Sequence, residues 1–140
     1  MRKEYIDLVL RGLKESGTDL IIFLPDGKFR DLYPVLVKES GIKCIEVTNE
    51  AEGVSIAAGA WLGGKTPIMI MTNAGLRVAI EPLCRYGFTH EIPVVMLMSF
   101  TGEMGTRQWW AIPHGKTTIP LLQTLGIPYE IVKNKNEIVN

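Results

Sequence analysis

Cysteine is scarce in this chain, and charge of either sign is not in excess. The 140 residues include two cysteines, and 15 Lys and Arg balance 15 Asp and Glu. Cys44 and Cys84 lie far apart and form no Cys-x-x-Cys pair, so we interpret them as reduced structural thiols rather than as a disulfide or a metal site. A net charge of zero gives no electrostatic reason to bind nucleic acid. We therefore expect proteins or small molecules as partners.

Long apolar runs and the common cofactor motifs are also missing. No apolar run approaches membrane-spanning length, and Arg2, Lys3 and Glu4 bring charge too early for a secretory signal, so we expect a cytoplasmic protein without a membrane partner. The sequence has no Gly-x-Gly-x-x-Gly, Walker or nucleophile-elbow motif. His90 and His114 are isolated and lack metal-ligand spacing, so no metal bound by this chain is expected.

The segments that are present alternate between helical and extended patterns over a length that fits one domain, residues 1–140. The extended segments are apolar on both faces, which is typical of a parallel sheet covered by helices on both sides. The sequence thus predicts a doubly wound α/β fold with a mainly parallel sheet of about five strands. Expected strands are residues 20–24, 42–47, 67–72, 93–98 and 129–132, and expected helices are residues 4–15, 29–40, 50–62, 76–86 and 116–125.

The most informative stretch begins the third of these helices. Asn49, followed three residues later by Glu52, has the pattern of a helix N-cap with a capping-box carboxylate. The capping pattern gives Glu50 no role. A carboxylate in the first turn stabilises a helix through the helix dipole, so from the pattern alone Glu50 either only stabilises the helix start or is a functional group.

The same helix is poor in bulky side chains. Gly53, Ala57, Ala60 and Gly64 recur at spacings of three and four, so one side of the helix is nearly flat and allows another backbone to come close. This flat face is either an internal packing seam or half of a subunit interface.

Small polar turns follow several of the expected strands. They are residues 25–28, 72–75 and 100–102, and in a parallel sheet such turns gather at one edge, together with Glu50. The segment from Ser99 to Gly115 has no clear periodicity, and a loop of that length is usually functional or mobile. Its Trp109 and Trp110 form either an exposed binding patch or an anchor for the loop.

Four blocks of sequence carry a resemblance to a known family. The chain resembles the pyrimidine-binding domain of thiamine diphosphate-dependent 2-oxoacid decarboxylases, and most of all those that act on sulfopyruvate and phosphonopyruvate. The second block is the most specific, because Glu50 precedes Gly59 by nine residues, as the family's glutamate precedes a glycine. The blocks are residues 24–27, residues 49–53 with 57–65, residues 71–76 and residues 112–116.

The resemblance implies roles for individual residues. Glu50 would be the catalytic glutamate, which hydrogen-bonds N1′ of the cofactor's aminopyrimidine and favours the tautomer that takes the proton from the thiazolium ring. Pro25, Asp26, Asn73 and Gly75 would lie against the thiamine diphosphate together with Glu50. An anionic substrate tail would meet cations or a histidine, and the candidates are Arg77, Arg107, His114 and Lys116.

The resemblance also implies a missing part. In the family, a second domain with Gly-Asp-Gly holds the diphosphate and its Mg²⁺, and the chain has no Gly-Asp-Gly. A diphosphate-binding beta subunit is therefore expected as the partner of this single pyrimidine-binding domain, in a hetero-oligomer with at least two copies of each chain. The flat face of Gly53, Ala57 and Ala60 is the candidate contact. The alternatives are a non-catalytic α/β module that binds a small anion or regulates a partner, and a homo-oligomeric structural domain.

Overall fold

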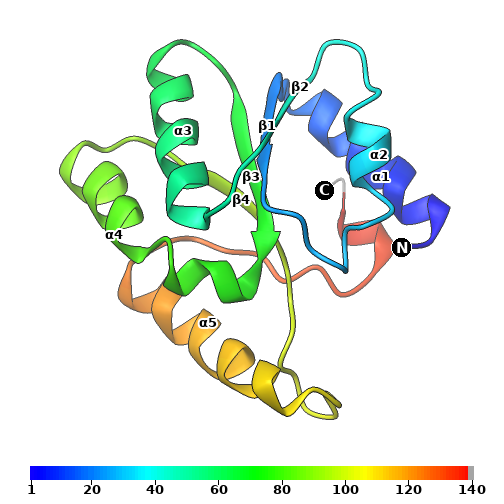
Figure 1. The fold of residues 1–140 in the computed structure, drawn as a ribbon, viewed down its shortest axis with the longest axis vertical. Coiled ribbons are helices and arrows are strands. Elements are labelled where there is room, and N and C mark those ends of the chain that lie inside the picture. Colours follow the sequence, from blue (N-terminus) through cyan, green and yellow to red (C-terminus); the bar gives the residue numbers. More distant parts are fainter. Residues whose placement is uncertain (139–140) are drawn as a thin grey trace.

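The computed structural model describes residues 1–138. Four strands form one parallel sheet in the order β2-β1-β3-β4 (Figure 1). The strands are β1 (Leu20–Phe23), β2 (Lys43–Glu46), β3 (Pro67–Thr72) and β4 (Val95–Ser99), and the α-helices are α1 (Lys3–Glu15), α2 (Tyr33–Leu36), α3 (Glu50–Leu62), α4 (Ile80–Leu83) and α5 (Ile112–Thr124). A π-helical turn spans Cys84–Thr89, and 3₁₀ turns span Asn73–Arg77, Trp109–Ala111 and Lys135–Glu137.

Helices cover both faces of the sheet, which confirms the doubly wound α/β fold. In Figure 1, α1 and α2 lie on one side of the strands and α3 and α4 on the other, with α5 below. The side chains of β1 are buried on both faces. Ile21 and Phe23 pack with the α1 and α2 residues, whereas Ile22 packs with α3. No helix within residues 1–138 is long and apolar enough to cross a membrane.

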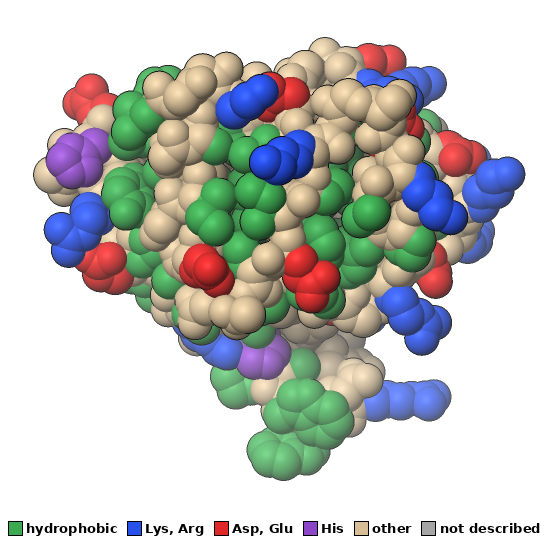
Figure 2. Space-filling view, turned by 45° about the horizontal axis from the view of Figure 1, so that its top comes forward, with side chains coloured by type: hydrophobic (Ala, Val, Ile, Leu, Met, Phe, Trp, Pro, Cys, Tyr) green, Lys and Arg blue, Asp and Glu red, His purple; other side chains and the backbone are tan. Residues whose placement is uncertain are grey.

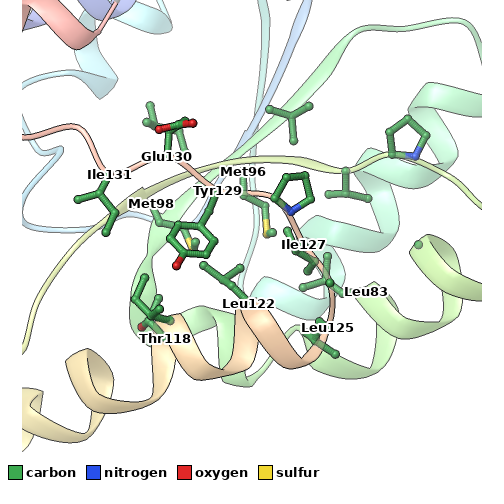
Figure 3. Close-up of a pocket in the computed structure, with 18 of the residues that line it drawn as sticks. Leu83, Met96, Met98, Thr118, Leu122, Leu125, Ile127, Tyr129, Glu130 and Ile131 are labelled. Atoms are coloured by element: carbon green, nitrogen blue, oxygen red, sulfur yellow. The ribbon is translucent and has the colours of Figure 1, made fainter.

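The sequence prediction of a fifth strand is wrong for the described chain. Residues Tyr129–Val132 have no strand structure, and the sheet ends at β4. A cavity of about 830 Å³ separates β4 from this segment and from α5, so the backbone groups of the segment do not reach the outer edge of β4 (Figure 3).

Prolines explain three further differences between the expected and observed helices. The helix expected over residues 29–40 is reduced to Tyr33–Leu36, because Pro34 fits only the first turn of a helix. The helix expected over residues 76–86 is broken into short pieces around Pro82. In contrast, α5 begins at Ile112 rather than at Lys116, because Pro113 is well placed in its first turn.

Candidate active site

The turns after the strands meet at the carboxyl edge of the sheet, as the sequence predicted. This edge is the lower end of β3 in Figure 1, where the arrowhead points. The hydroxyl of Ser99, at the end of β4, donates to the Asp26 carboxylate in the turn after β1, although β3 lies between the two strands. The side chain of Asn73, directly after β3, bonds Thr101 after β4. Because the strand order reverses at β1 and β3, this edge is also the topological switch point at which α/β domains bind ligands.

Glu50 occupies the first helical position of α3. The helix begins where the sequence predicted, because Asn49 is its N-cap and accepts a bond of 2.8 Å from the backbone N–H of Ala51. The Glu52 carboxylate reaches back to the N–H and hydroxyl of Thr48, at 3.1 and 3.2 Å. The predicted capping box is not formed, because Glu52 bonds Thr48 rather than the N–H of Asn49. Glu52 still serves the helix start, and Glu50 is not needed for it.

The Glu50 side chain is buried, with 9% of its surface exposed. Among residues 1–138, no group donates a hydrogen bond to its carboxylate and no cation pairs with it. Since no fully buried side-chain oxygen among these residues lacks a partner, the Glu50 oxygens reach the surface, where a donor that the chain itself does not supply can meet them.

Gly75 holds the Glu50 carboxyl in place from the turn after β3. A Cβ atom on Gly75 would lie 2.5 Å from Oε1 of Glu50 and still closer to its Cγ. Glycine is the one residue that lets the backbone of this turn approach the carboxyl so closely. The pair is brought together by two separate elements, α3 and the 3₁₀ turn Asn73–Arg77.

Asn73 is a structural clamp rather than an open ligand group. Its side chain is 1% exposed and donates to the Thr101 carbonyl and to Oγ1 of Thr118 on α5, both at 3.0 Å. Its Oδ1 accepts from the N–H and the hydroxyl of Thr101, at 3.1 and 2.9 Å. The side chain that the sequence assigned to the cofactor thus joins three elements of the edge.

Asp26 is fixed by short-range bonds on the same edge. Its Oδ1 accepts from the Lys28 N–H at 3.1 Å, and its own N–H donates to the Tyr33 hydroxyl at 3.0 Å. Burial is the main reason that the pKa of Tyr33 is raised. Pro25 is exposed beside Asp26. Both residues therefore face the same end of the sheet as Glu50.

Two of the four candidates for substrate binding contact each other. Nη2 of Arg77 donates to Nδ1 of His114 at 2.5 Å, so the 3₁₀ turn after β3 is linked to the first turn of α5. Burial, followed by the charge of Arg77, lowers the pKa of His114 from its usual value of 6.5. Arg107 and Lys116 are exposed, and among residues 1–138 neither forms an ion pair.

The flat face of α3 is an internal seam, so its proposed role as the subunit contact is wrong. A Cβ atom on Gly53 would lie 2.5 Å from Sδ of Met69 on β3 and 3.4 Å from Ile22 on β1. Ala57 is also fully buried against the sheet. The small residues let α3 lie close to β1 and β3, which leaves that face no surface for a partner.

The cavity beside β4 borders this edge through Thr118, which lines the cavity and accepts a bond from Asn73. Figure 3 shows Met96, Met98, Leu122 and Tyr129 around it, and its lining is largely apolar. None of the site residues predicted from the sequence lines it. It has few convergent polar groups, so the chemistry of the chain is better sought at Glu50.

Sequence reasoning assigned no role to three polar residues that build the edge, although Thr101 lies in a turn that was expected there. Ser99, Thr101 and Thr118 position Asp26 and Asn73, and Ser99 and Thr118 are buried. The available signal was that Ser99 and Thr101 follow an apolar strand directly. Thr118 gave no signal, because a threonine within a helix is ordinary.

Comparison with known proteins gives the class of the chain. No protein-family model matches it. The solved structure of benzoylformate decarboxylase from Polynucleobacter necessarius has a TM-score of 0.60 and 19% identity, over 83% of this chain and 23% of that one. The fold is thus that of a domain found in decarboxylases.

Two relatives narrow this class. Sulfopyruvate decarboxylase subunit alpha of Methanothermobacter thermautotrophicus is 29% identical over 137 residues, which are 98% of this chain and 83% of that protein. Subunit alpha from Methanococcus maripaludis is 30% identical over 131 residues, 94% of this chain and 78% of that protein. The chain belongs to the family of sulfopyruvate decarboxylase alpha subunits, which confirms the resemblance found in its sequence.

Proposed function

We propose that this chain is the pyrimidine-binding subunit of a thiamine diphosphate-dependent 2-oxoacid decarboxylase, and that Glu50 is its catalytic glutamate. The observation that carries the proposal is the Glu50 carboxylate itself. It is only 9% exposed at the switch point of the sheet, lies against Gly75 and has no hydrogen-bond partner among residues 1–138, while its oxygens can still be reached from outside. A ring nitrogen that carries or accepts a proton is the kind of group that would satisfy it.

The residues around Glu50 fit the aminopyrimidine of such a cofactor. When bound, thiamine diphosphate supplies the electron sink that takes up the electron pair released as carbon dioxide leaves. With such a cofactor bound, Glu50 would hold and move a proton at ring nitrogen N1′. Gly75 would keep the carboxyl in one place for this role, and Asn73 supports the turn of Gly75 through its bonds to Thr101.

Asp26 and Pro25 would lie over the reacting part of the cofactor and the substrate. The bonds from Ser99 and from the Lys28 N–H orient the Asp26 carboxylate. An oriented carboxylate at this position is available for proton transfer to or from the substrate. Pro25 would exclude water from the same region with its rigid ring.

For the substrate, we infer a 2-oxoacid with an anionic tail of the sulfopyruvate type. Arg77, held by His114, is the first candidate to bind the tail, because its guanidinium lies on the 3₁₀ turn that also carries Gly75. His114 would set the direction of the guanidinium. Arg107 and Lys116 remain further candidates, and both are exposed to solvent.

The remaining parts of the site are inferred to lie on a companion. Relatives of the chain are named subunit alpha, which implies a partner subunit. We infer that residues 1–140 are a single pyrimidine-binding domain and that a beta chain with Gly-Asp-Gly holds the diphosphate and Mg²⁺. Since the cofactor would lie between the two chains, we expect a hetero-oligomer with at least two copies of each.

The experiment that tests this function begins with the companion. A tagged copy of the chain is recovered from an extract of its own host, and the protein that co-purifies is identified and co-expressed. The complex is then assayed with sulfopyruvate, phosphonopyruvate and pyruvate, with and without thiamine diphosphate and Mg²⁺. Carbon dioxide release that depends on thiamine diphosphate supports the proposal. A complex that binds anions but releases no carbon dioxide would favour a non-catalytic binding module.

Glu50→Gln in the same complex tests the role of the carboxylate. Loss of proton transfer by a positioned carboxyl typically lowers turnover by roughly 10²–10⁴-fold, while the unfolding midpoint should be unchanged. Glu52→Gln is the matched control, because Glu52 is in the same helical turn and bonds Thr48 instead. Near-normal turnover of the Glu50→Gln complex would sink this assignment.

A further inference from the structure

The segment before α5 ends in an exposed aromatic tip, which we define as Trp109 and Trp110. Their side chains are 76% and 59% exposed, and the two rings pack edge to face with centroids 6.1 Å apart. Met104 is fully exposed in the same loop. Figure 2 shows hydrophobic side chains gathered on the part of the molecule that projects from its lower end. The sequence left this tip unexplained, and the proposed chemistry does not use it.

The base of the tip is rigid. Gly102 has a φ of +92°, and a Cβ atom there would overlap the Ala111 carbonyl and lie 2.5 Å from the Gly115 nitrogen. Ala111, the residue after the two tryptophans, is buried. Thr101, one residue before Gly102, is bonded to Asn73. The tryptophans are thus held out from the body by a fixed support, and they do not anchor the loop to the core.

The tip is tied to the same edge as the unpartnered carboxylate. Asn73 bonds Thr101 at the start of the loop and Thr118 on α5, and it lies two residues before Gly75, which abuts Glu50. The Glu50 carboxylate and the loop that carries the tip are thus joined at one edge of the sheet. Large amphipathic rings held rigidly are the side chains that most often anchor protein interfaces.

We propose that Trp109 and Trp110 are the anchor by which this chain docks onto its companion subunit. This inference rests on the proposed function, which requires a companion at this edge. Arg107 and Lys116 flank the tip and are exposed, and among residues 1–138 neither has an acidic partner. The surface that receives the tip is accordingly an apolar socket with acidic side chains on its rim.

The affinity of the purified companion for variants of this chain tests the assignment. Trp109→Ala/Trp110→Ala is expected to raise the dissociation constant at least 100-fold. The unfolding midpoint should not change, because both rings are exposed. Trp61→Ala is the matched control, because Trp61 is the third tryptophan of the chain and lies on α3, away from the tip. It should bind within threefold of the wild type.

The effect on turnover separates docking from other roles. At companion concentrations that saturate the double variant, kcat and KM should return to wild-type values. A raised KM with unchanged assembly would overturn the proposal in favour of substrate contact. Loss of binding to vesicles of phosphatidylserine and phosphatidylcholine, with unchanged assembly, would overturn it in favour of a membrane. A wild-type chain that self-associates through the tip and leaves the companion unbound would also overturn it.

Failure of the docking proposal is distinguishable from failure of the proposed function. Glu50→Gln should assemble with wild-type affinity and lack turnover, whereas the tip variant should have turnover once it is assembled. A complex that needs the tip to form but releases no carbon dioxide supports docking and contradicts the decarboxylase. An active complex that forms equally well with the double variant contradicts docking alone.

Discussion

Glu50 and Gly75 come from different elements and touch so closely that a methyl group on Gly75 would overlap the Glu50 carboxyl. One residue begins α3, and the other lies in the turn after β3. The contact fixes the position of the carboxyl without giving it a hydrogen bond, so the group is placed but not neutralised. This combination is what a site needs if a ligand is to supply the missing donor.

The first prediction concerns this contact. Gly75→Ala should displace the Glu50 carboxyl by about an ångström, and such a displacement typically lowers turnover by roughly 10²-fold. The φ of Gly75 is not in the left-handed region, so the backbone accepts alanine, but overpacking against Glu50 should lower the free energy of unfolding by about 1–3 kcal/mol. Turnover of the assembled complex and the unfolding midpoint measure the two effects. Full activity would mean that Glu50 needs no fixed position.

The second prediction concerns the Asn73 clamp. Asn73→Ala leaves Thr118 and the Thr101 N–H without their partner in a buried place, so the free energy of unfolding should fall by about 2 kcal/mol or more. Asn73→Asp should cost at least as much, because an oxygen would then face the Thr101 carbonyl. Chemical denaturation measures both variants. A neutral effect would show that water replaces the amide without loss.

The third prediction compares two glycines of α3. Gly59→Ala should raise the free energy of unfolding by up to about 1 kcal/mol, because alanine is the better helix former and the site has open space. Gly53→Ala has the same helical gain, but the new methyl group collides with Met69 and costs about 1–3 kcal/mol. Equal stability of the two variants would contradict the internal seam.

The fourth prediction concerns the titration of His114. Its pKa should lie below the usual 6.5, and Arg77→Met should raise it part of the way, because burial is the larger cause and remains. Proton NMR of the ring measures this directly, since the chain has two histidines and His90→Gln assigns the signals. A His114 pKa unchanged by Arg77→Met would contradict the contact.

The same shift makes a fifth prediction, for stability. The pKa of His114 is lowered in the folded state. As the pH falls through 6.5, the unfolded chain therefore takes up a proton at His114 before the folded chain does. The contribution of His114 is therefore present above pH 6.5 and declines toward the lowered pKa. As the pH is lowered from 7.5 to 5, the unfolding midpoint of the wild type should decrease more than that of His114→Gln. His90→Gln serves as the control.

The sequence predicted those features that depend on short-range pattern. The start and end of α3 follow from Asn49 and from Gly63-Gly64, and β3 has the predicted bounds because it is apolar on both faces and central in the sheet. The gathering of Asp26, Asn73 and Glu50 at one edge follows from parallel topology alone.

What the sequence did not predict depends on contacts between distant segments. The flat face of Gly53 fits the sheet as well as it fits a partner, and only the position of Met69 decides between the two. Asn73 was assigned to a ligand, but a polar residue directly after a strand is typical both of ligand binding and of structural bonds between segments. Its bond to Thr118 joins residues 45 positions apart, which no local pattern encodes.

The Asn73 amide also has a consequence for how the protein opens. It connects the end of β3, the loop after β4 and α5, so none of these segments can leave the body while the other two stay in place. Their amide protons should then exchange with solvent in a single concerted event rather than by separate fraying. A side chain buried one residue beyond a strand thus sets the slowest local fluctuation of the whole edge.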